Sequence, residues 1–505
     1  MSTFFLGIDC GSTMVKAALF NRNGKEIAVR SAKNKLLHPN SGWTETDMEA
    51  VWQNAVDVIR EVVRSSGVDP KQIACIACCG HGNGLYLVDE NGKPTRNGIS
   101  SSDGRARKYI EDWNRDNLLE TLRPKTMQAI WPAQPNALLR WLIDHEPQSI
   151  DTARWLFMCK DFVRFRLTGE AFMERTDMSG TSLIDVGTGE YDDTLLDAWG
   201  LSATRRLMPP LRDSAEICGC ITPEVAAQTG LVAGTPVAGG MFDIDAAGLA
   251  VGMVDETQLC LIAGTWGNNQ YVSKTPVVSS DIFMTSRYSI PGYYLMLEGS
   301  ASSASNLEWI VSEFFQADKQ LLEKSGNIYS YCVDLASQTK AEESGVIFLP
   351  YLYASPVSLD GKGVLFGLDG RQTRGHVLRA VLEGIVFGHV WHVEKLLNFR
   401  QKPETVRLTG GGTASKFWTQ MFADIFQTRV EVPAGTELGC LGAAICAAVA
   451  IGEFSSYESA CREMVHIDQV HEPDQSLADV YRRKYGRFRQ LLDILAPAWE
   501  ALVWE

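Results

Sequence analysis

One local pattern occurs twice in the chain, at residues 6–20 and again at residues 258–274. An apolar strand, a turn of glycine and hydroxyl residues and a second strand make up "LGIDCGSTMVKAALF", and the same order is found in "QLCLIAGTWGNNQYVSK". A hairpin of this kind must bury its apolar residues in a larger sheet, so two copies predict two similar α/β domains facing each other across a cleft. The alternative to two similar domains is that such hairpins simply recur in an α/β protein.

The first part of the chain alternates between strands and helices. Residues 21–24, "NRNG", predict a hairpin turn that leads into a third strand. An amphipathic helix is expected over residues 46–66, with Thr46 or Asp47 as its N-cap. The apolar run "IACIACCG", residues 73–80, predicts a fully buried fourth strand, so the sheet should be covered on both faces.

Composition limits the classes of partner. The chain has 505 residues, enough for roughly two to three domains, and a net charge of −14 without a block rich in lysine or arginine. This argues against nucleic acid and anionic membranes as partners, so an anionic ligand must be held by backbone N–H groups, a metal or single cations. The N-terminus lacks a signal-peptide pattern, and the apolar stretch 439–452 is too short to span a bilayer and predicts a tightly packed core helix. A cytoplasmic protein with no membrane partner is expected.

Twelve cysteines are scattered along the chain, and Cys75, Cys78 and Cys79 form their one cluster. The Cys75-x-x-Cys78 spacing alone permits zinc or redox chemistry, but no second Cys/His pair stands at zinc-ligand spacing. Because the cluster lies in an apolar run, buried thiols of a strand are the favoured interpretation.

The turn of the first copy has the residues to receive an anion. Gly11 lets the backbone come close to a ligand, and Ser12 and Thr13 offer N–H and hydroxyl donors to phosphate oxygens. Lys16 supplies a cation, and Asp9 at the carboxyl end of a strand suits Mg²⁺. A purely structural turn is the alternative, and no Walker A motif occurs in the chain.

A third glycine turn lies in "VRLTGGGTASKFWTQMFADIF", residues 406–426. An apolar strand leads into Gly410, Gly411 and Gly412, and an amphipathic helix is expected to start near Ser415. Backbone N–H groups and a helix N-terminus are suited to a nucleotide or another anion. A structural turn between strand and helix is the alternative.

Two aspartates, Asp243 and Asp245, lie among glycine and alanine residues after an apolar run. Burying an acid is costly without a role, and a carboxylate facing a cleft would serve as a general base toward a hydroxyl group. The alternative is that one of the two caps the alanine-rich helix that follows.

These features together resemble the FGGY carbohydrate kinases of the actin/Hsp70/sugar-kinase ATPase superfamily. The most specific point is "GVLFGLDGRQTRGHVLRAVLE", residues 363–383, which is similar to the C-terminal signature of the family. The resemblance implies two ribonuclease H-like (actin-like ATPase) domains of α/β class flanking a central cleft. It places a sugar-binding domain at 1–250, a nucleotide-binding domain at 251–490 and a helical tail at 491–505.

The resemblance also implies a role for individual residues in an ATP-dependent kinase that uses Mg²⁺. Asp243 matches the catalytic base and substrate contact, Asp9 lies beside the metal, and Asp245 matches no motif and is expected to be structural. The residues that match the phosphate and adenosine motifs are Ser12, Thr13, Lys16, Gly264, Thr265, Gly267, Gly411, Gly412 and Ser415.

The expected sugar side departs from the family pattern. Leu138 stands where relatives usually have lysine, and Ser101 stands where glycerol kinases and xylulokinases usually have tryptophan. The expected sugar contacts are His81, Gly82, Asn83, Asp103 and Gln134, although His81 and Asn83 serve equally well as turn residues.

Short stretches such as "SSD" and "NLEW" are most similar to the L-xylulose kinase branch, whose relatives also act on 3-keto-L-gulonate. The expected reaction is phosphorylation of a primary hydroxyl of a ketopentose, with D-xylulose, ribulose, glycerol or erythritol as alternative substrates. A non-catalytic ATP switch on the same scaffold is the alternative class. Dimers are common among relatives, so the resemblance also allows this chain to form a homodimer.

Overall fold

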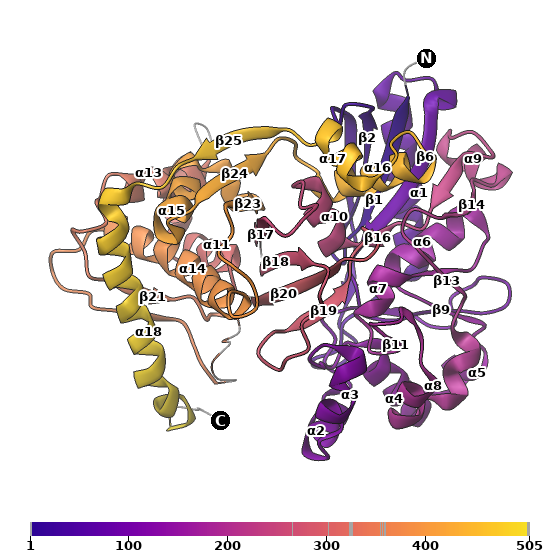
Figure 1. Cartoon of the computed structure of the whole chain (residues 1–505), viewed down its shortest axis with the longest axis horizontal. Coiled ribbons are helices and arrows are strands. Elements are labelled where there is room, and N and C mark those ends of the chain that lie inside the picture. Colours follow the sequence, from indigo (N-terminus) through magenta and orange to yellow (C-terminus); the bar gives the residue numbers. More distant parts are fainter. Residues whose placement is uncertain are drawn as a thin grey trace. The chain divides into compact units, whose positions relative to one another are not determined.

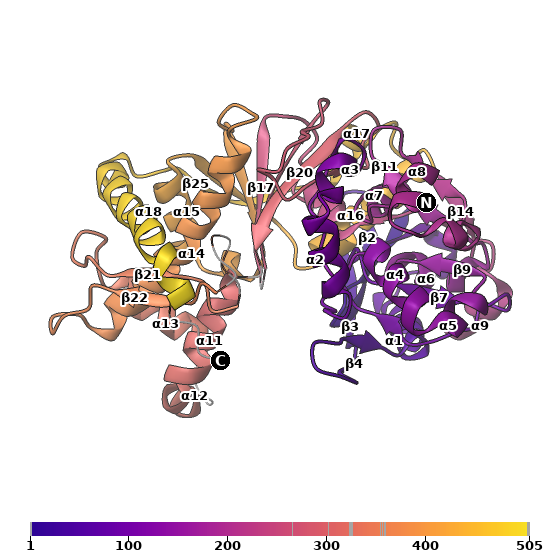
Figure 2. The same cartoon turned by 90° about the horizontal axis from the view of Figure 1, so that it is seen from below.

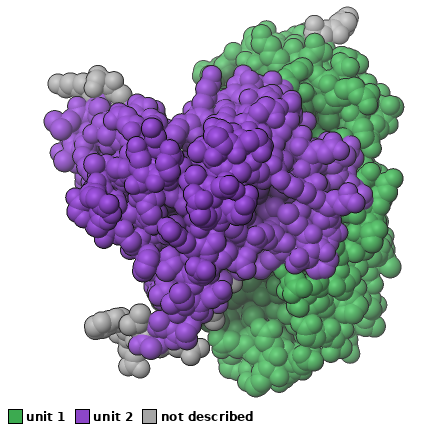
Figure 3. Space-filling model, turned by 60° about the vertical axis from the view of Figure 1, so that its left-hand side comes forward, with its two compact units in different colours: residues 1–254, 272–296, 435–466 green, residues 255–271, 297–434, 467–505 purple. Residues whose placement is uncertain are grey.

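The computed structural model describes residues 3–264, 266–300, 302–322, 327–353, 355, 357 and 360–501. The chain divides into two compact units (Figure 3). Unit 1 comprises Met1–Val254, Val272–Met296 and Gly435–His466, and unit 2 comprises Asp255–Tyr271, Leu297–Ala434 and Ile467–Glu505. Unit 1 therefore takes in two segments that follow residue 254 in sequence. The domain boundaries expected from the family stay a prediction.

The sheet of unit 1 is built around the first copy of the hairpin. Strand β1 (Phe4–Cys10) pairs antiparallel with β2 (Met14–Asn21) and parallel with β6 (Ile73–Gly80), in the order β14-β15-β6-β1-β2-β3. A short strand, β16 (Met241–Phe242), also pairs with β6. The strands and the turn predicted for this region are confirmed. The other strands of the sheet are β3 (Glu26–Lys33), β14 (Ile217–Cys220) and β15 (Pro236–Ala238).

Helices cover this sheet, as the buried strand pattern predicts. Helix α1 (Met48–Ser66) packs against β2 and β3, and its N-cap is Asp47, whose side chain accepts hydrogen bonds from two N–H groups of the first turn. Helix α16 (Leu438–Ala450) packs against β1 and β6, and a side chain at Gly7 would overlap the backbone of Cys440. The predicted tightly packed helix is confirmed, and Figure 1 shows it beside strands from the start of the chain.

The remaining elements of unit 1 are short. They are β4 (Leu36–Leu37), β5 (Glu45–Thr46), β7 (Tyr86–Val88), β8 (Gly98–Ile99), α2 (Arg107–Arg115), α3 (Leu118–Thr126), α4 (Pro135–His145), α5 (Pro147–Asp151), β9 (Trp155–Phe157), α6 (Cys159–Thr168), β10 (Met173–Glu174), α7 (Arg175–Ser179), β11 (Ile184–Asp185), β12 (Glu190–Tyr191), α8 (Asp193–Ala198), β13 (Leu211–Arg212), α9 (Pro223–Thr229), α10 (Asp243–Ala250), β19 (Met284–Arg287) and α17 (Tyr457–Met464).

The sheet around the second copy repeats the same pairing scheme. Strand β17 (Gln258–Ala263) pairs antiparallel with β18 (Gly267–Ser273) and parallel with β23 (Thr405–Thr409). Beyond β23 lie β24 (Arg429–Pro433), which is parallel to it, and β25 (Ile467–His471), which is antiparallel to β24. The duplication predicted from the sequence is thereby confirmed in the fold.

Helices of unit 2 pack around this second sheet. Helix α18 (Ala478–Ala501) packs against α14 (Arg374–Leu396) and β21 (Ile347–Leu349) (Figure 2). Since α18 starts at Ala478, the helix runs continuously past residue 491, where the sequence placed the start of a tail. The other elements are β20 (Tyr294–Ser300), α11 (Ala304–Phe314), α12 (Gln316–Leu322), α13 (Ile328–Ser337), β22 (Val364–Phe366) and α15 (Lys416–Phe426).

The cysteines are all free thiols, and Cys75, Cys78 and Cys79 are buried in β6. The interpretation as buried strand residues is confirmed. Among the described helices, none combines the length and the apolar character that crossing a membrane requires.

Candidate active site

The turn between β1 and β2 is held through its backbone. The side-chain amide of Asn34 donates to the Gly11 carbonyl at 2.9 Å, and the Asn34 N–H donates to the Thr13 carbonyl at 2.9 Å. Ser12 is half-buried and Thr13 is exposed. The turn is thus fixed without using the two hydroxyl groups that the sequence singled out.

Lys16 contacts an acid that sequence reasoning missed. Its Nζ lies 2.7 Å from Glu437 Oε2, although the two residues are 421 positions apart. Burial opposes the charge of Lys16, but the Glu437 carboxylate outweighs this and raises the pKa of Lys16. No local pattern could have found this pair, because the loop before α16 reaches β2 only in the folded unit.

Asp9 lies at the end of β1, directly opposite Lys16 in the antiparallel register. Burial raises the pKa of Asp9 to about 6, and the charge of Lys16 opposes this rise. A Cβ at Gly439, in the first turn of α16, would lie 2.7 Å from Asp9 Oδ2. Glycine at that position leaves room beside the carboxylate oxygen.

Asp243 is the first residue of α10 and is half-buried in unit 1. Burial raises its pKa to about 7, and the negative charge of Asp9 adds to the rise. The two carboxyl groups predicted to act in the reaction therefore lie close enough to interact electrostatically. A carboxyl with a pKa near 7 is suited to accept a proton from a hydroxyl group.

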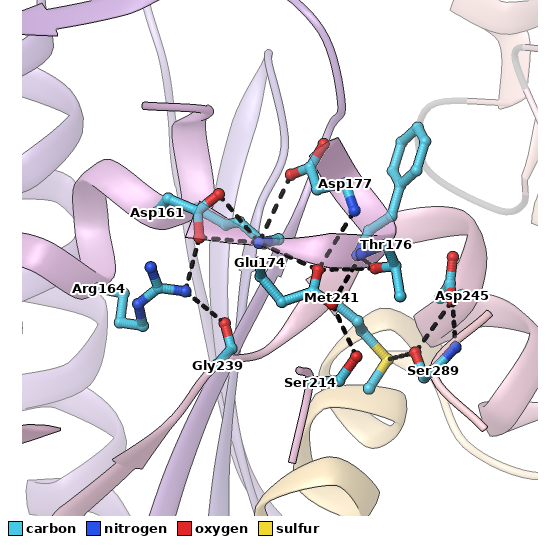
Figure 4. A network of polar contacts seen from close by, with 12 residues as sticks. Asp161, Arg164, Glu174, Thr176, Asp177, Ser214, Gly239, Met241, Asp245 and Ser289 are labelled. Carbon is cyan, nitrogen blue, oxygen red and sulfur yellow. Dashed lines mark hydrogen bonds and ion pairs between the residues drawn. The ribbon is translucent and has the colours of Figure 1, made fainter. Parts of the chain in front are cut away.

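The alternative that one of the two aspartates caps α10 is wrong. The N-cap position is occupied by Phe242, and Asp243 already lies within the helix. Asp245 is fully buried, and its Oδ1 accepts hydrogen bonds from the N–H of Ser289 at 2.8 Å and from its hydroxyl at 3.0 Å (Figure 4). Asp245 thus has a structural role, as the sequence indicated.

His81, Gly82 and Asn83 follow β6, as expected for loop residues. The ring nitrogens of His81 lie 3.2 Å from the Tyr86 hydroxyl and 3.3 Å from the Gly82 carbonyl oxygen, and burial lowers the pKa of His81 to about 4. Asn83 has a left-handed φ of 64° and is buried. A side chain at Gly82 would overlap the ring of Phe242.

Asp103 and Gln134 are both fully buried in polar contacts of their own. The Asp103 carboxylate pairs with Arg105 at 2.9 Å and also accepts the N–H of Thr44 at 2.6 Å. The Gln134 side-chain amide donates to Gln128 Oε1 at 2.9 Å and to the Gly180 carbonyl at 3.2 Å. In this structure both side chains connect neighbouring segments of unit 1.

Three loops of unit 1 meet around these residues. Gly84 donates its N–H to the Ala133 carbonyl at 2.9 Å, Gln134 reaches Gly180, and a Cβ at Gly82 would lie 3.0 Å from Asp177 Oδ1. Buried polar atoms nearly always have partners, so several lacking one in a single region indicate a place for polar ligands or water. Within the described residues, the buried atoms without a hydrogen-bond partner in these loops and the adjoining helices belong to Asn83, Gln134, Asn136, Asp177 and Ser182, although Asp177 also forms an ion pair with Lys160 at 3.6 Å.

The glycine turns of unit 2 lie against each other. Gly410 has a φ of 103°, and a Cβ there would lie 2.5 Å from the Ala263 carbonyl oxygen and 2.9 Å from the Gly264 nitrogen. Only glycine fits between the two turns. Thr265, expected to contact phosphate, lies outside the described residues, whereas Gly264 and Gly267 bound the end of β17 and the start of β18.

A cavity of about 700 Å³ opens beside these turns within unit 2, a volume suited to a nucleotide-sized ligand. Ser415 is the N-cap of α15, and its hydroxyl accepts the Trp418 N–H at 3.1 Å. The predicted residues that line the cavity are Gly264, Gly411, Gly412 and Ser415. The sequence analysis did not assign to the site the lining residues Leu307, Glu308, Asn327, Tyr329 and Trp418. Trp418 follows the glycine turn on α15, whereas the other four lie on or beside α11 and α13, where no glycine motif marks them.

A neutral hydrogen-bond chain supports the second hairpin from behind. The Asn269 side-chain amide donates to the Glu298 carbonyl at 3.1 Å, so its Oδ1 accepts from His389 Nδ1 at 2.8 Å. The Ser303 hydroxyl then donates to His389 Nε2 at 3.0 Å. Burial lowers the pKa of His389 to about 3, which keeps the ring uncharged. A Cβ at Gly267 would lie 3.1 Å from Ser303, so the chain backs the turn directly.

This arrangement defines the class of protein. The two sheets share one pairing scheme. Unit 1 has a base-like carboxyl at a helix start, and unit 2 has a nucleotide-sized cavity beside glycine turns. This combination is typical of sugar kinases with the actin-like ATPase fold. Xylulose kinase from Rhodospirillum rubrum has this fold, with a TM-score of 0.87, 27% identity and coverage of 98% of this chain and 100% of that chain.

The chain belongs to the FGGY family of carbohydrate kinases. The N-terminal domain of the family matches residues 4–250, and the C-terminal domain matches residues 259–451. L-xylulose/3-keto-L-gulonate kinase from Escherichia coli (strain K12) is 36% identical over 98% of both chains. Probable L-xylulose kinase from Pasteurella multocida (strain Pm70) is 34% identical over 97% of this chain and 99% of its own. The chain is therefore an ATP-dependent sugar kinase, and the predicted family, fold class and enzyme class are confirmed.

Proposed function

We propose that this kinase phosphorylates a primary hydroxyl of L-xylulose, or of the sugar acid 3-keto-L-gulonate. The similarity to the Escherichia coli and Pasteurella multocida proteins, at 36% and 34% identity over nearly the whole chain, supports this choice of substrate. The observation that carries the mechanism is the half-buried Asp243, whose pKa burial raises to about 7.

Asp243 acts as the general base in this proposal. Its carboxylate accepts the proton of the sugar hydroxyl as the oxygen attacks the γ-phosphorus of ATP, the bond to the leaving ADP oxygen breaks, and ADP and the sugar phosphate are the products. A pKa near the working pH lets the group both hold and release a proton in each turnover.

Asp9 would hold Mg²⁺. A carboxylate oxygen is the ligand type that Mg²⁺ prefers, and Gly439 leaves space beside Asp9 Oδ2. Mg²⁺, when bound, neutralises charge on the phosphates. Lys16 adds a cation nearby that Glu437 keeps in place, since its Nζ lies 2.7 Å from Glu437 Oε2.

The phosphate and adenosine residues follow the same proposal. Ser12 and Thr13 would donate to phosphate oxygens from the first turn, and Gly264 and Gly267 from the second. Gly411, Gly412 and Ser415 would hold the nucleoside in the cavity of about 700 Å³. These three residues and Gly264 line that cavity.

The sugar would bind where the three loops of unit 1 meet. His81, Gly82 and Asn83 would lie nearest to it, with Asp103 and Gln134 fixing the loops. The unpartnered buried oxygens of Asn83 and Gln134 support this location, since a hydroxyl-rich ligand supplies the donors that they lack. A cytoplasmic location is proposed on the twelve free thiols, while the homodimer stays a prediction.

A coupled kinase assay with purified protein tests the proposal. L-xylulose and 3-keto-L-gulonate are expected to give the highest kcat/KM in a panel with D-xylulose, ribulose, glycerol and erythritol. Asp243→Asn should lose about 10²-fold or more of kcat while ADP still binds, because base removal leaves the nucleotide cavity intact. Asp193→Asn, whose side chain on α8 is 86% exposed, is the matched control. Near-normal turnover by Asp243→Asn would show that this residue is not the base.

A further inference from the structure

A fully buried network of charged residues in unit 1 includes Asp161, Arg164 and Glu174 (Figure 4). Glu174, at the end of β10, is its centre. The Glu174 carboxylate accepts the N–H groups of Thr176 at 2.8 Å and Asp177 at 3.2 Å, so it caps α7. Ser214 donates its hydroxyl to Oε1 at 2.8 Å, and Lys160 Nζ lies 3.5 Å from Oε2. The position of this carboxylate is therefore fixed from several sides.

Thr176 connects the network to the peptide before Asp243. Its hydroxyl donates to Glu174 Oε2 at 2.7 Å, and the same oxygen accepts the N–H of Phe242 at 3.0 Å. A hydroxyl has one proton, so donation to Glu174 leaves a lone pair directed at Phe242. Because that carboxylate is held in place, the Thr176 oxygen has a defined position as an acceptor.

Phe242 is also fixed through its ring. A side chain at Gly82 would overlap the ring, and a Cβ at Gly180 would lie 3.2 Å from it, so two glycines make the space that the ring fills. Phe242 is the N-cap of α10, and Asp243 follows it directly. The backbone N–H and the ring together determine how α10 begins.

We propose that Thr176 is a positioning residue for the reaction: its hydroxyl, oriented by Glu174, holds the Phe242 peptide and thereby the direction of the Asp243 carboxylate. This inference rests on the proposed role of Asp243 as the base. Thr176 is fully buried and contacts neither substrate in the proposed function, so it acts only through Phe242. A base must lie within hydrogen-bond reach of the proton it accepts, and small displacements of such a group lower turnover strongly.

The matched variants are Thr176→Val, Thr176→Ser and Ser214→Ala. Valine keeps the shape of threonine and removes the hydroxyl, whereas serine keeps the hydroxyl. Ser214→Ala removes one hydrogen bond from the same Glu174 carboxylate but leaves the bond to Phe242 intact. If the network only stabilised the fold, Thr176→Val and Ser214→Ala would behave alike.

Steady-state kinetics and ADP binding distinguish the two outcomes. Thr176→Val is expected to lower kcat by about tenfold to 10²-fold, with the KM for ATP and the Kd for ADP unchanged. Thr176→Ser and Ser214→Ala should keep kcat within about threefold of the wild type. Equal losses in Thr176→Val and Ser214→Ala, or a Thr176→Val enzyme with normal kcat, would overturn the proposal.

Two further comparisons keep the test decisive. If Thr176→Val does not fold, Thr176→Ala and Thr176→Ser differ by a single oxygen atom, and only the alanine variant should lose kcat. Asp243→Asn measured beside them separates this inference from the proposed function. Normal turnover in Asp243→Asn refutes the base itself, whereas a defect in Asp243→Asn with none in Thr176→Ala refutes only the positioning role.

Discussion

The two hairpin turns share one backbone plan and differ in the chemistry behind it. In unit 1 the turn between β1 and β2 is flanked by charged groups, Asp9 and the Lys16–Glu437 ion pair. In unit 2 the turn between β17 and β18 is backed by the uncharged chain through Asn269, His389 and Ser303. The two copies thus share their strand pairing but differ in their electrostatics.

This difference separates the expected responses of the two units. Charged carboxyl groups respond to pH and to cations, because their protonation changes the local field. A buried neutral chain responds instead to the loss of a partner, since its remaining groups are left unsatisfied. Perturbations of unit 1 should therefore act on the chemical step, and perturbations of unit 2 on nucleotide binding.

The largest effect is expected from Asp9→Asn in unit 1. Removing the carboxylate proposed to hold Mg²⁺ should lower kcat by about 10²-fold to 10³-fold and weaken the dependence of the rate on Mg²⁺ concentration. ADP binding measured without Mg²⁺ should be unchanged. Asp57→Asn, on α1 with a side chain that is 48% exposed, is the control. A normal Mg²⁺ titration in Asp9→Asn would remove Asp9 from the metal site.

Acidification should affect the same unit nearly as strongly. Asp243 accepts a proton only when ionised, and its pKa is about 7, so kcat/KM for the sugar should fall about tenfold per pH unit below 7. Asp9, with a pKa of about 6, takes up a proton in the same range. The hydrogen-bond chain behind the turn of unit 2 should stay neutral from pH 5 to 8, because His389 has a pKa of about 3.

The raised pKa values also fix the sign of the effect on stability. A carboxyl group that binds its proton more tightly in the folded than in the unfolded chain makes the folded state less stable as the pH rises from about 4 to about 7. Asp243→Asn should weaken this pH dependence of the melting temperature. A rate profile that is flat between pH 5 and 8 would show that the carboxyl groups of unit 1 do not titrate as described.

A smaller effect is expected from His389→Ala in unit 2. The substitution removes the partner of the buried Asn269 Oδ1 and of the Ser303 hydroxyl, at a cost of about 1–3 kcal/mol in unfolding free energy, while Asn269 keeps its bond to the Glu298 carbonyl. Loss of support behind Gly267 should raise the KM for ATP about tenfold, with a smaller change in kcat. His471→Ala, half-buried on β25, is the control. A large loss of kcat at unchanged KM would contradict the division of roles between the units.

Local patterns in the sequence predicted most of the elements that carry the site. The ends of β1 and β17 at Cys10 and Ala263, the Asp47 N-cap and the glycine turn before α15 all depend on neighbouring residues. The base-like carboxyl at 243 also stood out, because an acid among small apolar residues is costly to bury.

Contacts between distant segments could not be predicted in this way. Glu437 reaches Lys16 across 421 positions, and Thr176 reaches Phe242 across 66 positions. Neither pair follows a helical or strand period, so nothing in the sequence marks the residues as partners. The alternative that Asp243 or Asp245 caps α10 could not be decided from neighbouring residues either, because the space that the Phe242 ring fills at the N-cap position is bounded by Gly82 and Gly180 of other segments.

The packing of α16 on β1 has a consequence for synthesis of the chain. The ribosome releases strand β1 long before the helix that covers it, Leu438–Ala450, because most of both units lies between them in the sequence. Until it emerges, apolar residues of the nascent sheet stay uncovered and prone to aggregate or to recruit chaperones. A premature stop codon anywhere before residue 435 would therefore damage the N-terminal half of the enzyme as well as the missing end.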